Sequence, residues 1–524
     1  MYVNWQMIMT GFMENIKKRR GTLLDNLVTI ILLGIIIAMV LIFAIANLFH
    51  YTANMEADIA SESLLTEVLY DNGFIQPDTW CASTTLRVIS VPNFAAFIYP
   101  LVGYNSNLAT GITCTVFLVI MLVLLLGYLR NIGMDVNASL LALIVLCMVT
   151  NPSDESQRMV FLYASYYVSH VVTMIVVLNI YACFLEKDTV KLVPALLSFI
   201  IAAVNGMQGL HACMFCYFPI IVVEALRRLI CLICKEKQPN YTVLLWTMAI
   251  NAETLIVTKI MNANHVGTSR NIRHALAKFT QEVWPTIIET LSFKRMPVIT
   301  IVLVIFAIIG YGLTLKDILK NSTVKLWCSF CFPAGFFICV ILTTFTTFEV
   351  AGRYYLMLVF SVAIGTSLFV YHANIGFYHA LIGIVIIGSV ISAKEFYSSL
   401  VIGDRSEESS LYAISQWMEE SGYTYGYSTF DFSNPITVMK NNGVKVRAVT
   451  NMTDLEGLKW LSDSTWYPPT KSVEEETCYI VSEARRGEFN AFLEINNPQI
   501  ICTHEINDFM IYVLDRDYTV WEKQ

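Results

Sequence analysis

Two carboxylates four residues apart stand in a polar segment that follows the first long apolar stretch of the chain. The segment is Glu56-Ala57-Asp58-Ile59-Ala60-Ser61-Glu62. Residues four apart share one face of a helix, so Asp58 and Glu62 would lie together if this segment is helical. A carboxylate at a membrane surface, shielded from bulk water, can act as a general base on a hydroxyl group. Ordinary solvated loop acids would give the same pattern.

Three further ionisable residues, His170, Glu253 and Lys259, fall inside long apolar stretches. Ionisable groups at bilayer depth are costly and usually face a cavity or a partner. Glu253 and Lys259 are six apart on one expected helix, so they do not share a face. Glu253 could line a cavity for a lipid substrate or be the proton-coupled site of a transporter. His170 is better explained as a hydrogen-bonded interior histidine.

The elements that must position these residues are membrane helices. Hydrophobic residues make up 56% of the 524 residues and charged residues 14%, with a mean hydropathy of +0.58. Soluble proteins carry about a quarter charged residues, so most of this surface must face lipid. No basic patch interleaved with aromatic residues is present, which argues against a nucleic-acid partner.

Charge divides the chain into two parts. After about Ala393, acidic residues outnumber basic ones roughly two to one, and this part accounts for the net charge of -7. We therefore expect a multi-span membrane domain over residues 1–393 and a soluble domain over 394–524.

Apolar stretches predict about eleven membrane spans. They cover residues 27–48, 108–129, 138–150, 159–185, 192–207, 212–225, 241–261, 297–315, 324–343, 354–371 and 377–393. The first follows Lys17-Lys18-Arg19-Arg20 and is too long for a signal peptide, so we expect an uncleaved helix.

Basic residues between the spans favour a cytoplasmic N-terminus, and an odd span count then places the C-terminal domain outside the cytoplasm. The basic loop 262–296 falls on the outer side and conflicts with this rule, so either a span is miscounted or its charges are functional. Segments 59–70 and 86–101 of the first outer loop suit helices in the interface plane.

The tail has the pattern of a small α/β domain. An amphipathic helix over 407–421 stops at Gly422, and β-prone runs follow at 423–430, 444–449, 478–481 and 510–514.

The 13 cysteines give only a weak signal. Three CxxC pairs, at 213/216, 231/234 and 328/331, lie in or beside apolar runs, where cysteine behaves as a small hydrophobe. Cys478 and Cys502 fall in the soluble domain, and spacing alone leaves open whether they pair.

The layout is similar to that of the GT-C superfamily of membrane glycosyltransferases, and more narrowly to a group of bacterial GT-C-like proteins. The resemblance covers nearly the whole chain in layout, on short motifs. They are Asp58-Ile59-Ala60-Ser61-Glu62-Ser63, Trp80, Ser83, Leu86-Arg87, Asn205-Gly206-Met207-Gln208-Gly209 and Tyr425-Gly426-Tyr427-Ser428-Thr429-Phe430. Where an acid would be expected before Leu86-Arg87, this chain has Thr85, which puts a second loop carboxylate in doubt.

The resemblance implies an α-helical polytopic fold and a sugar donor linked to polyprenyl phosphate. Asp58, with Glu62 beside it, would then be the catalytic base, and inversion at the anomeric carbon would follow. Arg353, Arg270 and Arg273 are candidates to bind the leaving phosphate, because fixed arginine forks stabilise developing negative charge. Snorkelling to lipid headgroups would explain Arg353 equally well.

Asp154 and Glu155, in a short loop, are secondary acidic candidates, although polar turns between spans often look the same. The sequence requires no cofactor and leaves a divalent metal open. In the soluble domain Trp460, Trp466 and Tyr467 could stack on sugars or simply pack a core.

The sequence thus predicts an integral protein of a bacterial cell membrane that transfers a sugar to a glycan, lipid or protein acceptor outside the cytoplasm. Two alternatives remain. One is a secondary transporter or flippase, and the other is a non-catalytic membrane scaffold of the same fold. Fold resemblance alone does not decide between them.

Overall fold

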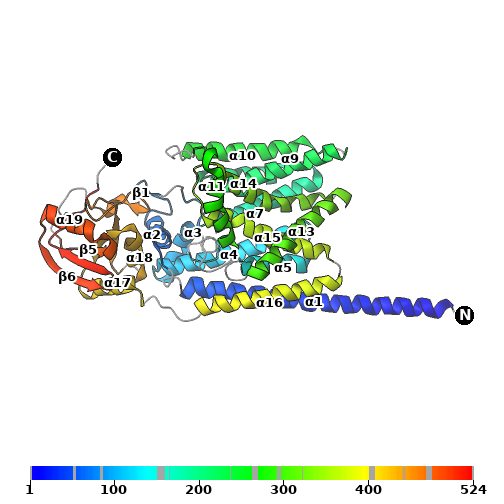
Figure 1. Ribbon diagram of the computed structural model, residues 1–524, viewed down its shortest axis with the longest axis horizontal. Coiled ribbons are helices and arrows are strands. Elements are labelled where there is room, and N and C mark those ends of the chain that lie inside the picture. The colour runs from blue at the N-terminus through cyan, green and yellow to red at the C-terminus, as the bar shows by residue number, and fades with distance from the viewer. Residues whose placement is uncertain are drawn as a thin grey trace.

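The computed structural model describes most of the chain. The described residues are 3–50, 55–82, 86–149, 160–163, 166–235, 238–261, 269–291, 297–321, 323–373, 375–400, 408–440, 443–467 and 475–521. A bundle of long helices stands beside a small domain built on a β-sheet (Figure 1).

Within the described residues, seven helical segments are long and apolar enough to cross a membrane. They lie in α1 (Val3–Phe49), α4 (Ser106–Asn131), α7 (Val168–Lys187), α10 (Tyr241–Met261), α13 (Pro297–Asn321), η6 with α14 (Val324–Phe330 and Cys331–Phe345), and η7 with α15 (Gly352–Tyr355 and Leu356–His372). The shorter predicted spans correspond to α5 (Val136–Val149), α8 (Leu192–Met207), α9 (Phe218–Ile233) and α16 (Ile375–Leu400). The chain is an integral membrane protein, while the exact number of crossings stays a prediction.

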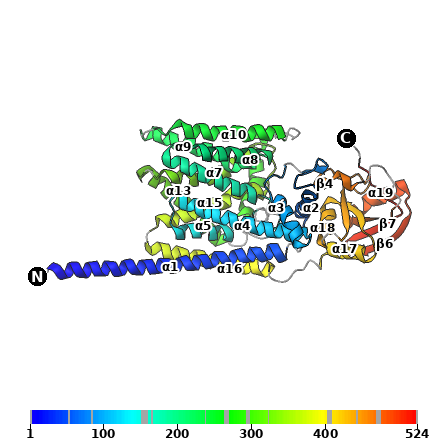
Figure 2. The ribbon, with the colours of Figure 1, turned by 180° about the vertical axis from the view of Figure 1, so that it is seen from behind.

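The N-terminal end of α1 and the C-terminal domain lie at opposite ends of the bundle, as both views show (Figures 1 and 2). An odd number of crossings produces this arrangement. Which end faces the cytoplasm stays a prediction.

Close helix contacts in the bundle depend on glycine. A Cβ atom added to Gly310 of α13 would lie 2.0 Å from the carbonyl oxygen of Gly365 in α15. Small residues let the backbones of membrane helices approach each other closely. This increases van der Waals contact between the helices, which matters because the hydrophobic effect does not drive helices together in lipid.

The segment between α1 and α4 contains α2 (Ala57–Asp71), the short strand β1 (Trp80–Cys81), α3 (Val91–Ile98) and a 3-10 turn, η2 (Tyr99–Val102). We expected residues 59–70 to lie in the membrane interface with one polar face. In the structure most of α2 is buried instead. The reason is that the C-terminal domain, through its helix α18 (Phe430–Met439), packs against α2.

The C-terminal domain is a five-stranded sheet with helices, so the predicted fold class is confirmed. The strand order is β3-β2-β5-β7-β6, with β2 parallel to β3 and β5, and β7 antiparallel to its two neighbours. The strands are β2 (Tyr425–Thr429), β3 (Lys445–Val449), β5 (Thr477–Ser482), β6 (Ile500–Ile506) and β7 (Phe509–Leu514), and the other helices are α17 (Ser410–Glu420) and α19 (Arg486–Asn496). The boundary at 393/394 stays a prediction; α16 continues to Leu400.

Cys478 and Cys502 are free thiols on strands that flank β7. Both are in register with Val513, so two strand spacings separate them, or about 10 Å. A disulfide requires Cα atoms closer than about 7 Å, and this register therefore does not allow the pair to form.

Backbone and side-chain contacts join the C-terminal domain to β1, to α2 and to the start of α4. β1 pairs antiparallel with β4 (Ser462–Asp463), so that Trp80 lies opposite Asp463. The Asn434 side chain donates to Ser61 Oγ over 2.8 Å, and Asn107 donates to the Val438 carbonyl over 2.8 Å. The helix that carries Asp58 and Glu62 is thereby fixed between the bundle and the domain.

Candidate active site

Asp58 and Glu62 occupy successive turns at the start of α2, which follows closely on the first membrane helix. Asp58 lies in the first turn and is exposed, whereas the Glu62 side chain is only 2% exposed. The positive end of the helix dipole stabilises a negative charge in the first turn. The sequence pattern therefore places one carboxylate at the edge of the bundle and one in its interior.

The buried carboxylate is paired with an arginine. Glu62 Oε1 lies 2.7 Å from Arg87 Nη2, and the Arg87 side chain is 16% exposed. Burial raises the pKa of Glu62, the Arg87 guanidinium opposes that rise, and the charge of Asp58 adds to it. The two carboxylates and Arg87 thus share one electrostatic neighbourhood.

The backbone around Arg87 is held by side chains from other elements. Gln208 Oε1 accepts hydrogen bonds from the backbone N–H groups of Val88 (3.1 Å) and Ile89 (2.6 Å). Asn93 donates to the Arg87 carbonyl over 3.2 Å. Gln208 belongs to the Gly-rich segment at the end of α8, so this segment fixes the loop that carries Arg87.

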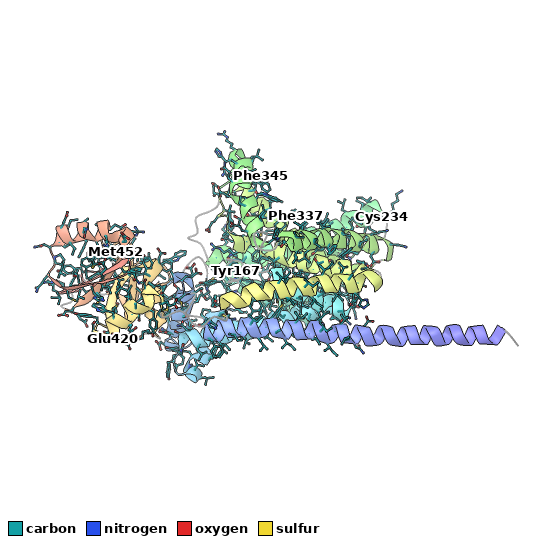
Figure 3. All side chains as sticks on the ribbon, turned by 60° about the horizontal axis from the view of Figure 1, so that its bottom comes forward. Tyr167, Cys234, Phe337, Phe345, Glu420 and Met452 are labelled. Carbon is teal, nitrogen blue, oxygen red and sulfur yellow. The ribbon has the colours of Figure 1, made fainter. Side chains whose placement is uncertain are left out.

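A group of aromatic and histidine side chains extends from Arg87 into the bundle. The Arg87 guanidinium lies 5.7 Å from the centre of the Tyr166 ring. Tyr167 Oη is 2.9 Å from His211 Nε2, and the His170 ring centre is 5.4 Å from that of His211. Figure 3 shows Tyr167 at the bundle end that faces the C-terminal domain and Cys234 at the other end.

Arg353 reaches the same group from η7. Its neighbour Tyr354 stacks on His211, with ring centres 6.2 Å apart. Burial lowers the pKa of His211 to about 4, with the positive charges of Arg87 and Arg353 contributing. His211 is therefore neutral at pH 7, and the positive charge in this region comes from the two arginines.

Arg353 also forms an ion pair with Glu349 (Nη2–Oε2, 3.1 Å) and remains 25% exposed. A partly exposed arginine can exchange a surface partner for a ligand anion at little cost, because such surface pairs contribute less than about 1 kcal/mol.

Arg270 and Arg273 are exposed and lie before and within the 3-10 turn η4 (Ile272–His274). This segment packs along the chain that leads to Arg353. The backbone of Arg270 forms an isolated antiparallel β-bridge with that of Thr346. Lys278 Nζ donates a hydrogen bond to the Phe348 carbonyl over 2.6 Å. The described part of the basic loop, residues 269–291, therefore packs against the segment that leads to Arg353.

The other predicted residues have different outcomes. His170 belongs to the His211 group, whereas Glu253 is half-buried on α10, with its Oε2 atom buried and without a hydrogen-bond partner among the described residues. Asp154 and Glu155 lie outside the described residues, as do Ser83 and Thr85. Among the residues that the structure describes, no group of three or more His, Cys, Asp and Glu side chains could hold a metal ion.

Sequence reasoning did not assign a role to Arg87, Tyr166, Tyr167, His211 or Gln208. Arg87 and Gln208 were noted only as parts of short motifs. The pairing of Arg87 with Glu62 crosses a loop of irregular backbone, and no periodic pattern predicts such a contact.

No protein-family model and no curated protein sequence matches this chain. Its structure is similar to the crystal structure of an oligosaccharyltransferase from Archaeoglobus fulgidus in complex with zinc and sulfate. The similarity covers 93% of this chain and 73% of that one, with 10% sequence identity and a TM-score of 0.44.

Proposed function

We propose that this chain is a membrane glycosyltransferase of the GT-C type. It transfers a sugar from a polyprenyl-phosphate donor to an acceptor outside the cytoplasm, with inversion at the anomeric carbon. One observation carries the proposal: an exposed carboxylate, Asp58, stands one helical turn from a buried Glu62–Arg87 pair at the bundle end where the folded domain docks.

In the proposed reaction Asp58 removes the proton from the acceptor hydroxyl. The hydroxyl oxygen then attacks the anomeric carbon, while the bond from that carbon to the phosphate oxygen breaks. The electron pair remains on the phosphate, and the proton remains on Asp58 until it is released to water. Attack opposite the leaving group inverts the configuration at the carbon.

Arg87 and Arg353 would stabilise the charge that develops on the phosphate. Donors that are fixed before the reaction need no rearrangement when the charge appears, which is why they lower the barrier. In this proposal Glu62 and Gln208 have a positioning role, because one orients the Arg87 guanidinium and the other holds its loop. Arg270 and Arg273 would attract the donor headgroup from the exposed basic segment.

The apolar outer surface of the bundle suits the lipid part of such a donor. Large side chains such as Leu196 and Ile200 of α8 and Ile308 of α13 are exposed. The transporter alternative would centre on Glu253, but the clustered polar groups lie instead at the bundle end beside α2.

The test uses membranes that contain the full chain and a panel of polyprenyl-phosphate sugars carrying a labelled sugar. We expect label to appear in an acceptor fraction for at least one donor, and the anomeric configuration of the product to be opposite to that of the donor. Retention of configuration would contradict a single displacement with Asp58 as base. If the whole panel gave no transfer, the glycosyltransferase proposal would be wrong.

A further inference from the structure

A pocket of about 320 Å³ lies between α2 and the C-terminal domain. Its lining residues on α2 run from Leu64 to Asp71, the last residue of the helix. At 1.5 Å per residue they lie about 9 to 20 Å along the helix from Asp58. Neither Asp58 nor Glu62 lines the pocket, so it is distinct from the candidate active site but on the same helix.

One wall of the pocket contains a buried arginine with unused hydrogen-bond donors. Arg447 of β3 is 6% exposed, and its guanidinium lies 3.8 Å from the centre of the Trp466 ring. Its Nε and Nη1 atoms are buried and have no hydrogen-bond partner among the described residues. Leaving such donors unpaired costs about 1–3 kcal/mol each.

The ring beside Arg447 is held rigidly. The Tyr425 hydroxyl donates to the carbonyl of Trp466, and Trp80 of the first outer loop packs edge-to-face on the Trp466 ring at 5.7 Å. Of the three aromatic residues considered for sugar stacking, Trp466 lines this pocket. Tyr467 is buried in the domain core, where it stacks on Tyr427.

The pocket combines charges of both signs. Glu67 and Asp71 are four residues apart on α2 and lie on one face of that helix. Lys445 and Arg447 are two residues apart on β3 and lie on one face of that strand. Carboxylates accept hydrogen bonds from sugar hydroxyls, and an arginine fork pairs with a carboxylate or a phosphate. A ligand with hydroxyl groups and one anionic group would match both walls, and the volume fits a small-molecule site.

We propose that this pocket binds an acidic saccharide unit of the acceptor, a sugar that carries a carboxylate or a phosphate, with its anionic group on Arg447 and its hydroxyls on Glu67 and Asp71. The pocket would bind one saccharide unit of the acceptor, while another part of the same acceptor presents the reacting hydroxyl to Asp58. The assignment to the acceptor rests on the proposed function, whereas the binding does not.

The test is a binding titration with the purified full chain in detergent. The probes are trigalacturonic acid, which carries carboxylates, glucose 6-phosphate, which carries a phosphate, and the neutral sugar maltotriose. We expect at least one acidic probe to bind with a Kd about ten- to hundredfold lower than maltotriose, as charge-assisted hydrogen bonds predict. Comparison of the two acidic probes distinguishes a carboxylate from a phosphate ligand.

Variants locate the binding. Arg447→Gln should abolish the preference for the acidic probe. Because Arg447 is buried, Lys445→Ala serves as an exposed variant that keeps the fold, and it should weaken binding of the acidic probe severalfold. Arg486→Gln on α19 is the matched control and should leave binding unchanged. Equal affinity for acidic and neutral probes, or unchanged binding in both pocket variants, would overturn the proposal.

The two proposals fail in different ways. Asp58→Asn should lose transfer and keep binding of the acidic probe. Selective binding without any transfer would disprove the glycosyltransferase proposal but leave the pocket as a saccharide site. Transfer without selective binding would disprove the pocket proposal alone.

Discussion

The Arg87 guanidinium is 2.7 Å from the Glu62 carboxylate, across a loop from the helix that carries both Glu62 and Asp58. This pair lies one helical turn from the exposed carboxylate of Asp58 at the end of the membrane bundle. Removal of one member of a buried ion pair leaves the other uncompensated. A substitution of either Arg87 or Glu62 therefore tests the role of this pair in the site.

Replacing Arg87 by Met should lower transfer by about a hundred- to a thousandfold, because the leaving phosphate loses a fixed donor. Glu62 can then become protonated, so the protein should still fold. Arg87→Lys should fall between wild type and Arg87→Met, since it keeps the charge but loses the planar fork. The measurement is kcat/KM, with thermal unfolding as the control for folding. Wild-type kcat/KM in Arg87→Met would exclude a role for Arg87.

Stability should fall as the pH drops from about 6.5 to 4 because of His211. Burial lowers the pKa of His211 from 6.5 to about 4 in the folded protein. Between these values the unfolded chain binds a proton that the folded chain does not, so stability is present above pH 6.5 and is lost below it. The loss from this one residue is up to about 3 kcal/mol.

Thermal unfolding in detergent at a series of pH values measures this effect. His211→Gln should show a smaller loss of stability over the window than wild type. His274→Gln, at an exposed histidine in η4, should show the wild-type loss. Equal losses in wild type and His211→Gln would mean that other groups cause the pH dependence.

Gly310→Ala should destabilise the bundle by about 1–3 kcal/mol, because the added methyl group would collide with the Gly365 carbonyl. Gly312→Ala is the matched control on the same helix, since a Cβ there meets nothing within 4 Å. The difference in melting temperature between the two variants measures the closeness of α13 and α15. Equal melting temperatures would contradict the packing described for these helices.

Asn434→Ala should weaken the docking of the C-terminal domain on α2. The side chain donates to Ser61 over 2.8 Å in a buried position, so its loss costs about 1–3 kcal/mol. We expect a lower melting temperature together with lower transfer, because α2 carries Asp58. Asn496→Ala, which removes a hydrogen bond within α19, should leave transfer unchanged. Wild-type transfer in Asn434→Ala would show that docking does not position the site.

Much of the fold follows from the sequence because hydrophobicity is a strong local signal. The first span is close to its predicted place, as are four of the five strands of the C-terminal sheet, β2, β3, β5 and β7. Helix α17 ends before Gly422, whose φ of +80° suits glycine. The fifth strand, β6 at one edge of the sheet, was not predicted. It is largely exposed and contains polar residues such as Thr503 and Glu505, so it lacks the buried pattern of a central strand.

The candidate site could be predicted only in part. Asp58 and Glu62 were found because helical spacing relates them within one segment. Arg87, Gln208 and His211 come from different segments, and their contacts depend on how loops cross the end of the bundle. The same limit applies to Arg447 and Asp71, which line one pocket only because the C-terminal domain packs on α2.

The most direct test of the central claim compares transfer from a polyprenyl-phosphate sugar by wild type, Asp58→Asn and Asp78→Asn. Asp78 is an exposed acid of the same segment between α1 and α4 and serves as the matched control. We predict that Asp58→Asn loses transfer at wild-type protein levels, because an amide cannot accept the proton, while Asp78→Asn retains it. Undiminished transfer by Asp58→Asn would contradict the assignment of Asp58 as the base.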